Sequence, residues 1–140
     1  MDETVKDKRI EEKELYGTLS DTTVVFADKL GEYLAEDSAT GKKLTTSQLR
    51  KFFGEVKRQQ ISGYNKTDFV MLKPKLAYAV GRAKKSAKNE PVKIEDFYKI
   101  ITDAIDKVEK CDEVNQKQAF VNFIKFFEAI VAYHKKYVKE

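Results

Sequence analysis

Apolar side chains recur every three or four positions along residues 112–138, which is the spacing of one face of an α-helix. The positions that share this spacing are Phe120, Phe123, Ile124, Phe127, Ile130, Val131, His134 and Val138. At about 1.5 Å per residue, a helix of this length spans roughly 40 Å. In a short chain, such an element is the support against which the other elements pack. The sequence therefore predicts a helical fold organised around its own C-terminal helix.

Four shorter patterns of the same period predict four further helices. Only two prolines and six glycines interrupt the chain, and no segment alternates like a strand. The fold class is therefore predicted as all-α, a compact bundle of about five helices. The first of these helices is expected from the N-cap Asp21 to about Glu36, and the second from the capping box of Thr45 and Gln48 to the break that begins at Ile61. The third is expected along the apolar stripe from Phe69 to Ala83, and the fourth from about Ile94 to Lys110.

Pro74 interrupts the third of these patterns. Proline cannot donate the helical hydrogen bond to the carbonyl of Val70. Either the helix kinks there, or Pro74 lies in the first turn of a helix that begins near Lys73. The sequence leaves both alternatives open.

The chain has 140 residues, of which 41% are hydrophobic, enough for one domain with a single core. We expect residues 1–20 to form a charged, flexible leader and residues 21–140 to form one helical bundle domain. No run of about 18 apolar residues is present, and the single cysteine, Cys111, cannot form an intramolecular disulfide. We therefore expect a soluble, cytoplasmic protein without membrane contact.

Positive charge is concentrated in the middle of the chain. Between Lys42 and Lys88 there are thirteen lysine and arginine residues but only two acids, Glu55 and Asp68, whereas the whole chain has a net charge of only +4. A dense cationic stretch on an ordered domain attracts polyanions, most commonly nucleic acid. A solvated surface and an acidic protein partner are the two alternatives.

The basic residues fall on two predicted helices, which can form one continuous surface if the helices pack antiparallel. Such a surface binds backbone phosphates rather than base edges, so it carries no sequence preference. Tyr64 and Tyr78 either stack on the bases of a single strand or bury their rings at the edge of the core. The candidate RNA-binding residues are Arg50, Lys51, Lys57, Arg58, Lys75, Tyr78, Arg82, Lys84 and Lys85.

The sequence lacks the residue patterns of an enzyme. One histidine and one cysteine cannot make a usual metal site, and no glycine-rich phosphate loop is present, so neither a metal nor a cofactor is expected. Paired acids such as Glu95 and Asp96 stand in polar segments or at predicted helix ends, where capping explains them. His134 lies on the apolar stripe and is expected to be a core histidine with its hydrogen bond satisfied.

Three segments, residues 44–52, 72–82 and 128–135, resemble the small subunit of the type III-A CRISPR interference complex, the Csm complex. They read LTTSQLRKF, LKPKLAYAVGR and EAIVAYHK, and the resemblance extends over residues 44–137. It implies a non-catalytic helical bundle whose copies stack inside the effector filament, beside guide RNA and target RNA, in antiviral defence. The implied protein partners are the large subunit and the repeated backbone subunit.

On this resemblance, the small subunit holds the guide–target duplex by its backbone. The basic positions that match the family are Arg50, Lys51, Lys75 and Arg82, while the other four basic candidates come from helical geometry alone. Gly81 also falls within the matching segment, and we interpret it as a point of close helix packing.

The C-terminal helix carries a second apolar strip, which consists of Phe126, Ala129, Tyr133 and Tyr137. A helix that is apolar on two sides is either central to its bundle or partly covered by another protein. We expect this strip to be exposed, to contact neighbouring subunits and to allow self-association. The alternative function is a protein scaffold whose basic face contacts acidic partner subunits, with RNA contact incidental.

Overall fold

The computed structural model describes residues 15, 17 and 19–140. This part of the chain contains helices and no strand, and two isolated bridges, Ser38 with Gly41 and Lys42 with Val92, pair backbone outside the helices. The all-α prediction is confirmed, and α5 and α6 together occupy the third predicted helix. The helices are α3 (Asp21–Leu34), α4 (Thr46–Ser62), α5 (Lys66–Val70), α6 (Leu72–Ser86), α7 (Ile94–Lys110) and α8 (Glu113–Tyr137).

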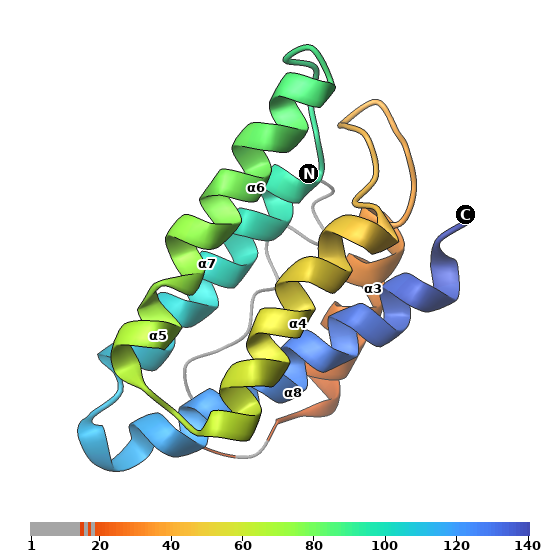
Figure 1. Cartoon of the computed structure of the whole chain (residues 1–140). Helices are drawn as coiled ribbons and strands as arrows, with labels where there is room; N and C mark the ends of the chain where they lie inside the picture. The colour runs from red at the N-terminus through yellow and green to blue at the C-terminus, as the bar shows by residue number, and fades with distance from the viewer. Residues whose placement is uncertain (1–14, 16, 18) are drawn as a thin grey trace.

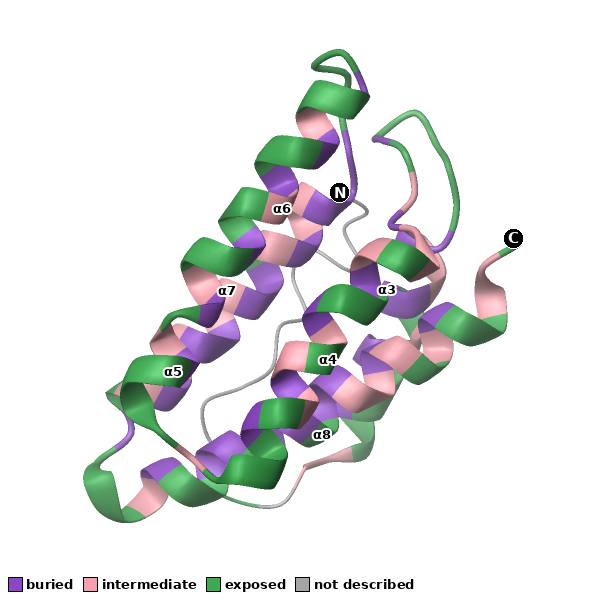
Figure 2. Cartoon of the chain, viewed as in Figure 1, coloured by how far each residue is buried: buried purple, intermediate pink, exposed green. Residues whose placement is uncertain are grey.

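The long helix α8 lies at the centre of the bundle, with α3 along one side and α4 and α7 on the other (Figure 1). Phe127 shows how the core is filled, because its ring packs against Phe52, Phe53 and Phe97 with centroids 5.4–5.8 Å apart. The buried residues accordingly follow the sides of the helices that face one another (Figure 2). Burial of these rings is the main source of stability.

The second apolar strip of α8 is covered by α3 of the same chain, so the prediction that it is exposed was wrong. Phe126 is only 1% exposed and stacks on Phe26 at 6.0 Å. Ala129 and Tyr133 are partly buried against the core, and the Tyr137 hydroxyl donates to Asp28 at 2.7 Å. The strip is apolar because α8 is central to its own bundle. Contact with another subunit through Phe126 would require α3 to leave.

Local sequence signals explain where the helices begin. The capping box at the start of α4 is confirmed: the Thr45 side chain accepts from the Gln48 amide at 3.1 Å, and the Gln48 side chain accepts from the Thr45 amide at 2.9 Å. At α3, however, the N-cap is Ser20 and not the predicted Asp21, which lies in the first turn. Pro74 lies in the first turn of α6, so the second of its two alternatives is confirmed.

A buried lysine joins the end of α3 to the start of α7. Lys93 is 1% exposed, and its ammonium donates to the carbonyls of Tyr33 at 2.7 Å and Glu36 at 2.5 Å. It also lies 4.1 Å from the centre of the Tyr33 ring. Carbonyls at a helix C-terminus lack helical partners, so a cation there stabilises them. Burial lowers the pKa of Lys93.

The N-terminal segment also contributes to the core. Leu15 is fully buried, and the Asn122 amide on α8 donates to the carbonyls of Leu15 and Gly17 at 2.8 and 2.7 Å. The predicted leader, residues 1–20, lies mostly outside the described residues, which omit 1–14, 16 and 18. The division into leader and domain stays a prediction. In the described chain, no helix combines the length and apolar character needed to cross a bilayer.

Candidate nucleic-acid interface

An open groove of about 400 Å³ lies between α4 and α6. The two helices run in opposite directions because the short segment after Ser62 and helix α5 reverse the chain (Figure 1). The antiparallel arrangement that one continuous basic surface requires is therefore present, but a groove separates the helices. The residues that line it are Thr45, Ser47, Gln48, Lys51, Phe52, Glu55, Lys75, Tyr78, Ala79, Arg82, Ala83 and Ser86.

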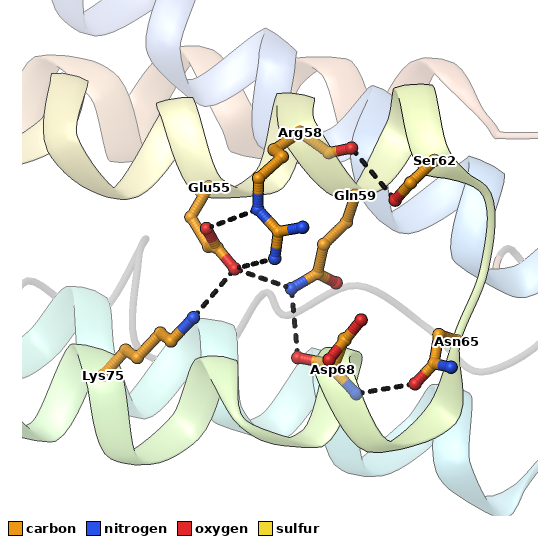
Figure 3. Close-up of polar contacts among 7 residues, drawn as sticks. All are labelled: Glu55, Arg58, Gln59, Ser62, Asn65, Asp68 and Lys75. Carbon is orange, nitrogen blue, oxygen red and sulfur yellow. Dashed lines mark hydrogen bonds and ion pairs between the residues drawn. The ribbon is translucent and has the colours of Figure 1, made fainter.

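Glu55 bridges the two helices across the groove (Figure 3). Its carboxylate accepts two hydrogen bonds from Arg58 on the same helix, at 2.6 and 3.0 Å, and one from Lys75 of α6 at 2.8 Å. The hydrogen bonds from Arg58, and those from Lys75 and Gln59, outweigh partial burial and lower the pKa of Glu55 to about 2. Glu55 is therefore ionised at neutral pH and offsets part of the positive charge of Arg58 and Lys75.

The nine predicted RNA-binding residues do not all share one surface. Lys51, Lys75, Tyr78 and Arg82 line the groove, and Arg58 reaches its edge through Glu55. The remaining four lie outside the groove lining: Arg50 and Lys85 are exposed, Lys57 lies 3.9 Å from Glu128 of α8, and Lys84 lies 2.9 Å from Glu95 of α7.

The structure divides the basic residues by their existing ion pairs. Lys57, Arg58, Lys75 and Lys84 each have a carboxylate partner within 4 Å. Within the described chain, the four other basic candidates make no such pair, and each is an exposed residue. These uncommitted cations are Arg50 and Lys51 on α4, and Arg82 and Lys85 on α6.

The two candidate tyrosines have different environments. Tyr64 packs its ring 5.1 Å from Phe120 and donates its hydroxyl to Gln116, so it lies at the edge of the core. Burial raises the pKa of the Tyr64 hydroxyl. Tyr78 is 69% exposed and borders the groove. The alternative in which the ring is buried at the edge of the core is therefore confirmed for Tyr64 and wrong for Tyr78.

The interpretation of Gly81 as a point of close helix packing was wrong. A Cβ added at Gly81, or at Gly54 on α4, would meet no atom within 4 Å. A Cβ at Gly31 on α3 would instead lie 2.7 Å from both the backbone nitrogen of His134 and the Cβ of Tyr133. The close helix contact is therefore between α3 and α8.

Sequence reasoning missed the polar part of the groove. Thr45, Ser47, Gln48 and Ser86 line the groove, whereas the sequence pattern indicates only that Thr45 and Gln48 cap a helix. The i,i+3 spacing of Glu55 and Arg58 is a signal that could have identified their ion pair. Nothing in the sequence indicates that Lys75 reaches the same carboxylate, because that contact depends on how two helices pack.

The chemistry of the remaining candidates agrees with a structural role. His134 is 1% exposed, and its Nε2 lies 2.6 Å from the carbonyl oxygen of Leu44, which confirms the prediction of a satisfied core histidine. Burial lowers the pKa of His134. Among the described residues, no three histidine, cysteine or acidic side chains are grouped so that they could hold a metal ion.

In a comparison with protein families, residues 19–140 match the model described as Csm2 Type III-A. No curated protein matches the chain. No solved structure matches it either. The family match includes every described helix and the groove between α4 and α6, and it agrees with the resemblance seen in three short segments. The chain therefore belongs to the Csm2 type III-A family, whose members are the non-catalytic small subunits of the Csm effector complex.

Proposed function

We propose that the groove between α4 and α6, with the cations on its two sides, holds the sugar-phosphate backbone of guide and target RNA in the Csm complex. The observation that carries this proposal is a set of four exposed cations without an ion pair in the described chain. Lys51 of α4 and Arg82 of α6 line the groove, and Arg50 and Lys85 lie on the same two helices outside its lining. Cations that are not already neutralised release the most counterions when they meet phosphates.

The side chains favour backbone binding over sequence recognition. Arginine and lysine on the exposed sides of two helices reach phosphates at several positions along a strand. Base recognition in duplex RNA would require access to base edges in a deep, narrow major groove, which side chains cannot enter. The small subunit then supplies affinity, and the pairing between guide and target supplies specificity.

The test is RNA binding by the full-length chain over a series of salt concentrations. The variant Arg50→Glu/Arg82→Glu is compared with the control Lys117→Glu/Lys125→Glu, which changes the net charge equally at two exposed sites on α8. We expect the first variant to weaken binding at least tenfold for any RNA sequence. Its log–log salt dependence should be shallower by roughly 1.4, which is two phosphate contacts at about 0.7 each. The control should change both quantities less.

Circular dichroism of both variants checks that they are folded. If the two variants lose RNA affinity equally, only the total charge of the protein matters, and the proposed interface is wrong. If Arg50→Glu/Arg82→Glu binds RNA normally but fails to join the other subunits, the basic surface contacts acidic proteins instead. That outcome is the scaffold function.

A further inference from the structure

We propose that the groove between α4 and α6 is a pocket for an unpaired RNA nucleotide, with its base stacked on Tyr78 and its phosphates held by Lys51 and Arg82. This inference rests on the proposed function, because it requires that RNA binds this surface. It adds that the surface distinguishes single-stranded RNA from a duplex.

Tyr78 is the first part of the argument. The ring is 69% exposed, and in the described chain it makes no hydrogen bond and no ring contact. Arg82 follows it by four residues on the same side of α6, and Lys51 lines the groove from α4. Single-strand binding sites combine exposed aromatic rings with nearby cations, because every base has a face that stacks and each base is followed by a phosphate.

The groove beside Tyr78 has the size and lining for one nucleotide. Its volume of about 400 Å³ falls within the range of roughly 300–1,000 Å³ found for small-molecule sites. Phe52, Ala79 and Ala83 supply apolar surface for the flat face of a base. Ser47 and Ser86 supply hydroxyls, which can bond to base edges or to the ribose 2′-hydroxyl. A paired base is stacked inside its duplex and cannot enter, so the occupant must be unpaired.

The experiment measures the affinity of the full-length protein for a labelled single-stranded RNA and for the blunt duplex of the same length. Tyr78→Ala is compared with Tyr78→Phe, which keeps the ring, and with Val114→Ala, a control at another exposed position. We expect Tyr78→Ala to weaken single-strand binding about tenfold and duplex binding less than twofold. Its salt dependence should stay unchanged, because no phosphate contact is removed. The other two variants should bind like the wild type.

The outcomes separate this inference from the proposed function. Single-strand binding that survives Tyr78→Ala but is weakened by Arg50→Glu/Arg82→Glu would overturn the pocket and leave the backbone interface in place. The pocket would also be overturned if Tyr78→Ala lost as much affinity for the duplex as for the single strand. It would be overturned too if Tyr78→Phe lost as much single-strand affinity as Tyr78→Ala. Binding that survives the charge reversals would overturn the proposed function itself.

Discussion

The contact between α3 and α8 is closed, whereas α4 and α6 stand apart with a groove between them (Figure 1). At the closed contact, Gly31 lets the two helices approach and Phe26 stacks on Phe126. At the open contact, the ion pair between Glu55 and Lys75 bridges the helices. The difference teaches that one pair of helices uses its side chains for packing, while the other keeps cations and a tyrosine ring available to a ligand.

Replacing an aromatic residue by alanine should affect stability strongly in the closed region and weakly in the open one. We expect Phe126→Ala to lower the free energy of unfolding by about 3–5 kcal/mol, because it removes a buried ring and leaves a cavity between α3 and α8. Tyr78→Ala should change it by less than about 0.5 kcal/mol, since that ring is exposed. Denaturant unfolding followed by circular dichroism measures both variants.

The comparison fails if the two variants lose similar stability. A small loss in Phe126→Ala would mean that α3 contributes little to the fold. Self-association through the α8 strip would then need to be tested again, by light scattering at two protein concentrations.

Glycine to alanine substitutions should also differ in sign between the regions. Gly31→Ala forces a Cβ to within 2.7 Å of α8 and should cost about 1–3 kcal/mol of unfolding free energy. Gly54→Ala meets nothing within 4 Å and should stabilise the protein by about 0.5–1 kcal/mol, through helix propensity alone. Thermal unfolding of the two variants measures the difference, and stabilisation by both would show that α3 and α8 are not in close contact.

The helices were predictable because their signals are local. The capping box of Thr45 and Gln48 and the apolar stripe of α8 need only neighbouring residues, and the structure has them where they were expected. The environments of Phe126, Tyr78 and Gly81 were not predictable, because each depends on which helix covers which face. Lys93 shows the same limit: a lysine at the start of a helix carries no sign that it will be buried against the end of another.

The candidate site was predictable as a set of residues but not as a geometry. Helical spacing identified the four residues that line the groove among the nine candidates: Lys51, Lys75, Tyr78 and Arg82. The same spacing also selected Lys57 and Lys84, which face other helices and pair with acids there. Charge counting cannot separate free cations from paired ones, because the partner acids come from distant parts of the sequence.

Replacing Glu55 in the open region should change the stability by an intermediate amount. Glu55→Gln should lower the unfolding free energy by about 1 kcal/mol at pH 7, since Arg58 and Lys75 are half exposed and water screens their attraction. The folded pKa of about 2 lies below the ordinary 4.5, so the stabilisation is complete above about pH 5 and is lost as the pH falls toward 2. The difference between wild type and variant, measured by denaturant unfolding, should therefore shrink below about pH 4.

The same substitution should also change how the open region binds RNA. Without the Glu55 carboxylate, Lys75 and Arg58 lose an internal partner and become available to phosphates. We expect Glu55→Gln to bind RNA several-fold more tightly than the wild type, with a steeper salt dependence. Glu128→Gln, which frees Lys57 outside the groove, is the matched control and should have a smaller effect. Weaker RNA binding by Glu55→Gln would mean that Glu55 positions the cations instead of competing for them.

The smallest effect is expected from Tyr137→Phe in the closed region. The Tyr137 hydroxyl donates to Asp28 at 2.7 Å, and this bond to a carboxylate raises the pKa of Tyr137 from 10.0 to about 12. Because the folded pKa is raised, the stabilisation is complete below pH 10 and is lost as the pH rises toward 12. The gap in melting temperature between wild type and variant should therefore narrow from pH 8 to pH 11. Tyr78→Phe, which removes an exposed hydroxyl without a partner in the described chain, should show no such change; an equal gap for Tyr137→Phe at both pH values would mean that the bond to Asp28 does not form in solution.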